Sequence, residues 1–318
     1  MNLSIACGDY DRTRRLLDGT IGIDNHRLTP STFPPEEMFR RAFETAEFDI
    51  SELSVSLFMQ RIGQGTSPYV GIPVFPSRAF RHSAIYVRSD GGVVTPEGLR
   101  GRKIGVRTYL NTAALVVRGL LAEAHGVMAN DIRWLVGDID QVERDTFPIP
   151  RLLRPVDIQA APRGVALADM LMSGEIDALI HYAPPREFNQ DKSRIRRLFT
   201  DPGRSEREYF QSTGIFPIMH LVGIRRSLLE DHPPLARQVY DAFTQAKAAA
   251  IADRRSQGSP FSAEVTETVE HAGRDFWPYG IQQNRLALES LTRYAFEQGL
   301  TDRQLRLEDL FVSSLLDR

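Results

Sequence analysis

The sequence P-V-F-P-S-R-A-F-R-H-S-A-I-Y-V-R at residues 73–88 joins two kinds of structure. Residues 73–82 are predicted to form a loop, because proline cannot donate to a sheet ladder and because arginines and a histidine stand among aromatics. Residues 83–88 alternate as a β-strand does, with Ala84 and Tyr86 opposite Ile85 and Val87. A loop rich in arginine and histidine that leads into a strand can hold an anion beside a proton carrier.

A similar pattern begins at His220. H-S-A-I-Y-V-R-S from His82 and H-L-V-G-I-R-R-S from His220 both read histidine, five mostly apolar residues, arginine and serine. Each also follows a loop that contains phenylalanine and proline. We interpret them as equivalent segments of a two-lobed fold, each delivering a histidine to a central ligand cleft. The predicted lobes are residues 1–84 plus 222–318, and residues 85–221.

The composition is that of an ordinary globular enzyme. The chain has 318 residues, enough for two lobes, of which 42% are hydrophobic and 25% charged. A net charge of -2 provides no general field for nucleic acid or an anionic membrane. No apolar run approaches the roughly 18 residues of a membrane span. Without a basic and apolar leader ahead of the first strand, the chain is expected to be cytoplasmic.

Strands and helices alternate along the chain, which predicts an α/β fold with mainly parallel sheets. The clearest helix is predicted at residues 112–125, where apolar residues recur at helical spacing and Gly126 follows as a stop. The single cysteine, Cys7, excludes an intramolecular disulfide and is expected to be a small buried side chain of the first strand.

Four stretches resemble the 4,5-dihydroxyphthalate decarboxylase family and are spread over nearly the whole chain. They are G-D-Y-D-R-T-R at 8–14, I-P-V-F-P-S-R-A-F-R-H-S-A-I-Y-V-R at 72–88, T-G-I-F-P-I-M-H at 213–220 and W-P-Y-G-I at 277–281. More broadly, L-R-G-R-K-I-G-V at 99–106 and D-M-L-M-S-G-E-I-D-A-L-I at 169–180 resemble type 2 periplasmic-binding-protein folds. The resemblance implies that fold: two α/β lobes joined by two crossing segments, with the ligand between them. The loop H-Y-A-P-P-R-E-F at 181–188 departs from the Ser-Pro-Arg-Ala-Pro-like sequence more frequent in the family.

The resemblance also implies a reaction, the non-oxidative decarboxylation of a hydroxylated aromatic acid, 4,5-dihydroxyphthalate, to 3,4-dihydroxybenzoate. Each carboxylate of this diacid is para to a phenol, so loss of the phenolic proton drives electron density to the carbon that bears the carboxylate. Protonation of that carbon breaks aromaticity, and departure of carbon dioxide restores it. The enzyme must bind carboxylates, remove a phenolic proton and protonate the ring, which requires no redox cofactor.

The candidate site residues follow from these requirements. His82, His181 and His220 suit proton transfer because imidazole titrates near neutral pH, and Asp9 could orient a histidine or accept the phenolic proton. Arginine binds carboxylates with a planar fork, and a helix N-terminus offers free N–H groups to an anion. The candidate substrate-binding residues are Arg78, Arg81, Arg107, Asn111, Thr112, Ser54 and Phe216.

Alternatives remain open at this point. His82, His181 and His220 could instead hold a divalent metal chelated by catechol oxygens, but no H-x-x-x-H, H-x-H or C-x-x-C spacing supports this, and we expect no cofactor. The alternative function is a non-catalytic binding or sensor protein for aromatic carboxylates, and a third is another lyase or hydrolase of this fold. The expected partner is a small aromatic carboxylate, with no nucleic acid and no membrane; a homo-oligomer is left open.

Overall fold

The computed structural model describes residues 1–142, 149–191, 193–257 and 277–318. The chain divides into two compact units. Unit 1 comprises Met1–Ala79, Gly214–Thr292 and Leu305–Arg318, and unit 2 comprises Phe80–Thr213 and Arg293–Gln304. The chain therefore passes between the units four times. The lobe boundaries expected at 84/85 and 221/222 stay a prediction.

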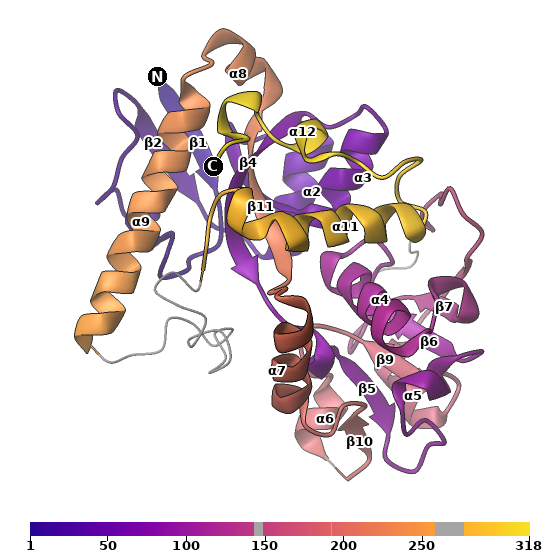
Figure 1. The fold of residues 1–318 in the computed structure, drawn as a ribbon. Helices are drawn as coiled ribbons and strands as arrows, with labels where there is room; N and C mark the ends of the chain where they lie inside the picture. The colour runs from indigo at the N-terminus through magenta and orange to yellow at the C-terminus, as the bar shows by residue number, and fades with distance from the viewer. Residues whose placement is uncertain (143–148, 192, 258–276) are drawn as a thin grey trace. The chain divides into compact units, whose positions relative to one another are not determined.

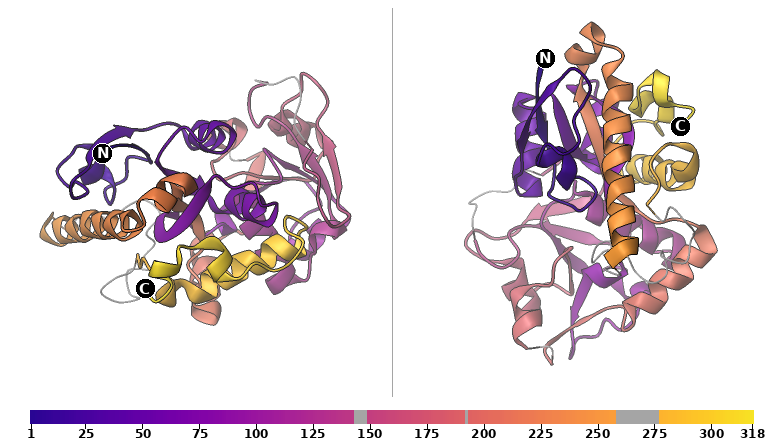
Figure 2. Two further views of the ribbon diagram at one scale, coloured as in Figure 1. Left: turned by 90° about the horizontal axis from the view of Figure 1, so that it is seen from above. Right: turned by 90° about the vertical axis from the view of Figure 1, so that its left-hand side faces the viewer.

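Unit 1 is built on a five-stranded mixed sheet with the order β2-β1-β3-β11-β4 (Figure 1). Its strands are β1 (Asn2–Ala6), β2 (Arg27–Ser31), β3 (Ile50–Ser54), β4 (Tyr69–Arg78) and β11 (Ile218–Arg225). β1, β2 and β3 are parallel, whereas β11 runs antiparallel to both β3 and β4. The helices of this unit are α1 (Arg14–Leu17), α2 (Pro35–Thr45), α3 (Val55–Gly63), α8 (Arg226–Asp231), α9 (Leu235–Gln257) and α12 (Leu307–Leu310). The long helix α9 packs against β4 and α1 (Figure 2).

β4 continues to Arg78, so the loop predicted over residues 73–82 is wrong in its first part. β4 lies at the edge of its sheet, and its register against β11 shifts twice. In this register His220 is opposite Ser77 and Val222 is opposite Ile72. Residues 73–76 of β4 therefore lie opposite Leu221 alone and form a bulge. Proline is tolerated at such positions because its missing N–H interrupts no ladder hydrogen bond.

Unit 2 contains a six-stranded mixed sheet with the order β10-β5-β9-β6-β7-β8. Its strands are β5 (Ile85–Arg88), β6 (Lys103–Val106), β7 (Arg133–Val136), β8 (Asp157–Ala160), β9 (Ala178–Ile180) and β10 (Ile195–Arg197). β9, β6, β7 and β8 are parallel, and β5 is antiparallel to β9 and β10. The expected parallel arrangement thus holds for only part of each sheet. The helices here are α4 (Thr112–His125), α5 (Leu167–Ser173), α6 (Arg186–Gln190) and α7 (Pro202–Thr213), and α11 (Arg285–Glu297) enters the unit at Arg293.

Helix α4 has the bounds predicted from its sequence, residues 112–125. The side chain of Asn111 accepts a hydrogen bond from the Ala114 amide at 2.6 Å and so satisfies one of the free N–H groups of the first turn. Gly126 ends the helix with a φ of 64°, in the left-handed region that favours glycine. The prediction of this helix is confirmed.

The strand predicted at residues 83–88 begins later than expected. His82–Ala84 is a 3-10 turn, η1, and β5 begins at Ile85. His220, in contrast, lies inside β11. The two histidines also belong to different units. The predicted equivalence of their segments is therefore wrong for the local structure, and delivery of both histidines to one ligand cleft stays a prediction.

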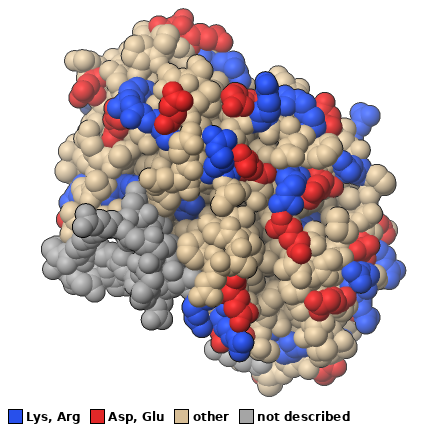
Figure 3. Space-filling model, viewed as in Figure 1, with Lys and Arg blue, Asp and Glu red and all other residues tan. Residues whose placement is uncertain are grey.

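Two further expectations concern Cys7 and the surface. Cys7 is fully buried, as predicted, and burial raises the pKa of its thiol well above the usual value. None of the helices in the described residues combines the length and apolar composition that crossing a membrane requires. Basic and acidic side chains are interspersed over the face drawn in Figure 3, in keeping with the small net charge.

Candidate active site

A carboxylate and an imidazole lie side by side on the unit 1 sheet. Glu52 is in β3 and His220 is in β11, and the antiparallel register places Glu52 opposite Val222 and His220 opposite Ser54. Glu52 and His220 are therefore diagonal neighbours on one face of the sheet. The Nδ1 of His220 donates to Oε1 of Glu52 at 2.5 Å. The ring of Phe39, in α2, meets the His220 ring edge-on at 4.9 Å between centroids.

Glu52 is fully buried and accepts two further hydrogen bonds. The amide of Gly8 donates to Oε2 at 2.8 Å, and the hydroxyl of Tyr10 donates to Oε1 at 2.9 Å. Burial alone would raise the pKa of Glu52, but the hydrogen bond and charge of His220, with the bonds from Gly8 and Tyr10, bring the pKa below its usual value. Glu52 is therefore a carboxylate at neutral pH and fixes the orientation of the His220 ring. No hydrogen bond within the described residues occupies Nε2 of His220, and a role of this nitrogen in proton transfer stays a prediction.

The stretches that carry the family resemblance meet in unit 1. Arg12 is fully buried between the rings of Tyr10 and Trp277, with its guanidinium carbon 4.3 Å and 4.1 Å from their centroids. Its Nε donates to the carbonyl of Pro76 at 2.6 Å, and the indole N–H of Trp277 donates to the carbonyl of Phe75 at 2.8 Å. These contacts join residues from the first, second and fourth stretches.

Arg78 joins the third stretch to the same cluster. It is 2% exposed and donates to the carbonyls of Phe216 at 3.0 Å and Pro278 at 2.9 Å, as well as to the side chain of Asn284. The ring of Phe216 stands perpendicular to that of Trp277, with 5.5 Å between centroids. Arg78 and Phe216 thus hold the cluster together, and their predicted contact with substrate stays a prediction.

The other candidates of unit 1 occupy different surroundings. Ser54 is the buried last residue of β3, directly across the strand pair from His220. The carboxylate of Asp9 is about half exposed and forms an ion pair with Arg14 at 2.9 Å. The substrate contact predicted for Ser54 and the catalytic role predicted for Asp9 stay predictions.

His82, in unit 2, is buried among aromatic rings. It is 4% exposed, and its ring centroid is 5.2 Å from that of Phe199 and 5.4 Å from that of Tyr209. Its Nδ1 has no hydrogen-bond partner in the described part of the chain. Burial lowers the pKa of His82 to about 4, so the ring is neutral at pH 7. These surroundings suit a packed side chain better than a proton carrier.

The remaining unit 2 candidates lie at ends of strands and helices. His181 follows β9, and its Nδ1 donates to the carbonyl of Ala183 at 2.9 Å. Arg107 follows β6 and forms an ion pair with the buried Asp138. Asn111 caps α4, and Thr112 is its buried first residue.

Arg81 lies next to a carboxyl group whose pKa is raised. Burial raises the pKa of Glu206, in α7, to about 7, although the charges of Arg197 and Arg81 oppose the rise. Arg81 itself is only partly buried and precedes the 3-10 turn that contains His82. Its predicted role in binding substrate stays a prediction.

Sequence reasoning missed Glu52, Tyr10, Arg12 and Phe39. A glutamate inside the strand I-S-E-L-S was a usable signal, because a buried acid requires partners. Tyr10 and Arg12 stood inside the first stretch that carries the resemblance. His220 and Glu52 are 168 residues apart in sequence, so no local sequence pattern connects them.

The described residues contain no group of three or more His, Cys, Asp or Glu that could hold a metal ion.

Comparison with known proteins gives close relatives and more distant structural neighbours. The chain is 38% identical to 4,5-dihydroxyphthalate decarboxylase from Comamonas testosteroni over 327 aligned positions, covering 100% of this chain and 98% of the relative. It is 41% identical to the enzyme of the same name from Pseudomonas putida over 212 positions, covering 67% of this chain and 82% of the relative. No family model matches the chain.

The fold resembles the crystal structure of the periplasmic aliphatic sulphonate binding protein SsuA from Escherichia coli. The TM-score is 0.56 at 14% identity, covering 98% of this chain and 92% of that one. The predicted fold class, an α/β type 2 periplasmic-binding-protein-like fold, is confirmed.

Proposed function

The chain belongs to the 4,5-dihydroxyphthalate decarboxylase family, and we propose that it removes one carboxylate of 4,5-dihydroxyphthalate as carbon dioxide and forms 3,4-dihydroxybenzoate. The observation that carries this function is the 38% identity to the Comamonas testosteroni enzyme over the whole chain. A non-catalytic binding protein is not favoured, because both relatives are decarboxylases.

The Glu52–His220 pair supports the proton chemistry of this reaction. Nε2 of His220 takes the phenolic proton, while Glu52 holds Nδ1 and stabilises the imidazolium that forms. The phenolate pushes electrons into the ring, and the carbon para to it takes a proton from an acid. The carbon–carboxylate bond then breaks, its electron pair restores the aromatic ring, and carbon dioxide leaves.

The cycle closes when His220 returns its proton to the phenolate. The proton taken up by the ring comes ultimately from solvent, so one proton is consumed for each carbon dioxide released. The group that delivers this proton is not assigned. The roles expected of the unit 2 candidates also stay predictions: His82, His181, Arg81, Arg107, Asn111 and Thr112.

We propose that this chemistry needs no metal. The carboxylate–imidazole pair can accept a proton without a Lewis acid, and the His220 nitrogen nearest Glu52 is already engaged. Metal binding by His82, His181 and His220 remains the second hypothesis. Full turnover after exhaustive chelation would favour the first hypothesis, and activity lost on chelation and restored by a divalent cation would favour the second.

The decisive experiment measures carbon dioxide release from 4,5-dihydroxyphthalate and from a panel of other hydroxylated benzoates. We expect turnover of the diacid by the wild type and severe loss in His220→Asn, with unchanged circular dichroism. Binding of the diacid without any carbon dioxide release would contradict the proposal. Turnover restricted to another acid would correct the substrate but retain the reaction.

Two properties of the protein in the cell stay predictions. The cytoplasmic location expected from the sequence is tested by cell fractionation. Self-association is tested by analytical ultracentrifugation of the purified enzyme across a concentration series, where a constant monomer mass would exclude a homo-oligomer over that range.

A further inference from the structure

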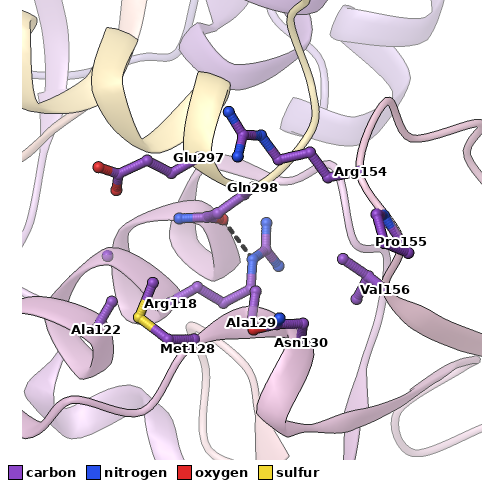
Figure 4. Close-up of a pocket in the computed structure, with 11 residues that line it drawn as sticks. Arg118, Ala122, Met128, Ala129, Asn130, Arg154, Pro155, Val156, Glu297 and Gln298 are labelled. Carbon is purple, nitrogen blue, oxygen red and sulfur yellow. Dashed lines mark hydrogen bonds between the residues drawn. The ribbon is translucent and has the colours of Figure 1, made fainter.

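A pocket in unit 2 contains none of the residues assigned to the candidate active site. It is lined by the second half of α4, by η3 (Ala129–Asp131), by residues 154–156 and by the end of α11 (Figure 4). All of these segments belong to unit 2. The cavity volume is about 230 Å³, below the roughly 300–1,000 Å³ of typical ligand pockets. The pocket therefore suits a small molecule.

Arg118 brings an unpaired positive charge to this pocket. It is 1% exposed, and its two hydrogen-bonded nitrogens contact neutral acceptors: Nε donates to Oε1 of Gln298 at 2.5 Å, and Nη2 donates to the carbonyl of Tyr109 at 2.8 Å. The third nitrogen, Nη1, is buried and has no hydrogen-bond partner in the described residues. Among the residues that the structure describes, no carboxylate lies within ion-pair distance of Arg118.

The positive charge of Arg118 is only partly compensated by its surroundings. Burial lowers the pKa of Arg118 to about 10, yet the side chain is still a cation at neutral pH. Its guanidinium carbon lies 3.7 Å from the centroid of the Tyr109 ring, which compensates part of the lost hydration. A buried charge without a counter-ion is still destabilising. An anion in the pocket would provide the missing charge and the acceptor for Nη1.

The other walls indicate what kind of anion fits. Arg154 adds a second positive charge and stacks over the ring of Phe296 at 4.3 Å. Glu297 also lines the pocket, but its side chain is exposed, and its Oε1 lies 3.9 Å from Nη1 of Arg293. An apolar wall is formed by Met128, Ala129, Pro155 and Val156, and Asn130 adds a polar side chain to the lining (Figure 4). The pocket therefore offers two cationic side chains together with an apolar wall.

We propose that this pocket binds a small organic monocarboxylate, with its carboxylate at Arg118 and Arg154 and its apolar body against Met128 and Pro155. Because Nη1 of Arg118 is covered from solvent, entry requires exposed neighbouring side chains to move aside. Arg154 and Met128 are both exposed and can do so. An inorganic anion would meet the two arginines but gain nothing from the apolar wall.

The methyl group of Met128 provides a local readout. The chain has 7 methionines, so methionine methyl NMR gives a simple spectrum in which Met128→Leu identifies the Met128 signal. We expect benzoate to shift this signal saturably, and inorganic phosphate at the same concentrations to leave it in place. A Met128 signal that benzoate does not move up to its solubility limit would overturn the proposal. Shifts with phosphate as strong as those with benzoate would also overturn the assignment to an organic acid.

Two exposed arginines of one loop form a matched pair of variants. Arg154→Ala removes a lining charge and is expected to weaken benzoate binding at least tenfold, whereas Arg151→Ala, three residues earlier and outside the lining, is expected to leave it unchanged. Equal affinities in the two variants would contradict the proposal. Arg118→Met is expected to abolish binding; should this variant not fold, the Arg154 and Arg151 comparison decides.

A second titration, with 3,4-dihydroxybenzoate, distinguishes two kinds of ligand: the product of the proposed reaction and monocarboxylates in general. Tighter binding than benzoate would identify the product of the reaction, and this identification rests on the proposed function. Equal binding would identify monocarboxylates in general. His220→Asn is expected to keep the Met128 shift. Loss of the shift in that variant would place benzoate at the candidate active site instead, whereas absence of decarboxylation alone leaves the shift unaffected.

Discussion

Glu52 carries a negative charge inside the unit 1 sheet, where burial alone would favour the protonated acid. The charge is retained because three donors converge on it, from Gly8, Tyr10 and His220. Removing one partner of such a network leaves the others buried and unsatisfied. Substitutions at these positions should therefore alter the orientation and protonation of His220.

Glu52→Gln tests this role directly. The amide keeps the size of the side chain but cannot stabilise an imidazolium or fix its tautomer as a carboxylate does. We expect kcat to fall by about 10²–10⁴, with a smaller change in KM and unchanged circular dichroism. The control is Glu47→Gln, an exposed acid of the same region that pairs with Arg41. Wild-type kcat in Glu52→Gln would exclude the pair from catalysis.

Gly8→Ala tests whether Tyr10 supports the pair. A methyl group at position 8 would lie 2.6 Å from the Tyr10 ring, so the ring must move away from Glu52. We expect kcat to fall and the pH profile of kcat to change, because one donor to the carboxylate is displaced. Gly22→Ala is the control, since no atom lies within 4 Å of the added methyl group. Identical pH profiles for Gly8→Ala and the wild type would contradict a role for Tyr10.

At the scale of elements, local signals predicted α4 well and β4 poorly. α4 combines an Asn111 cap, apolar spacing and a terminal glycine, all of which act within one helix. Pro73 and Pro76 suggested a loop, yet both are accommodated in an edge strand because its register shifts there. Whether a strand lies at a sheet edge depends on its neighbours, and the partner of β4 is far away in sequence. For the same reason the Glu52–His220 pair could not be predicted, although His220 itself could be proposed.

Gly119→Ala tests the packing of α4 against α11. Alanine is intrinsically favoured in a helix over glycine by about 1 kcal/mol. At position 119, however, the added methyl group would lie 2.4 Å from the ring of Tyr294. We expect a net loss of about 1–3 kcal/mol in the free energy of unfolding, measured by urea denaturation.

The matched control for this prediction is the double variant Gly119→Ala with Tyr294→Leu. The smaller leucine removes the ring, so the cost of the alanine should largely disappear in the double variant. Strictly additive effects of the two changes would show that the clash with the ring is not the cause.

At the scale of the whole molecule, acid should weaken the fold through His82. Its pKa is about 4 in the folded protein, below the usual value of 6.5. Between these two values the unfolded chain binds a proton that the folded chain does not, so the free energy of unfolding falls as pH decreases from about 6.5 to 4. Below pH 4 both the folded and the unfolded chain carry the proton on His82, so His82 causes no further change in the free energy of unfolding. The expected total is on the order of 3 kcal/mol.

His82→Leu isolates this contribution from those of the other titrating groups. The variant should show a flatter decline of the free energy of unfolding between pH 6.5 and 4 than the wild type, as measured by urea denaturation at a series of pH values. His232→Leu, a change at an exposed histidine, serves as the control and should keep the wild-type slope. A slope in His82→Leu as steep as that of the wild type would show that His82 titrates normally in the folded protein.

The position of β11 has a consequence for how the chain is made. β11 lies between β3 and β4 in the sheet, yet it begins 140 residues after β4 ends. On the ribosome, β3 and β4 therefore emerge with unpaired edges and must wait for all of the unit 2 residues up to Thr213 before their shared partner is synthesised. Closing so long a loop is slow, and unpaired edges invite association with other nascent chains. The strands of the unit 2 sheet are contiguous in sequence, so that sheet can be completed first. The sheet of unit 1, which begins the chain, is therefore the one completed last.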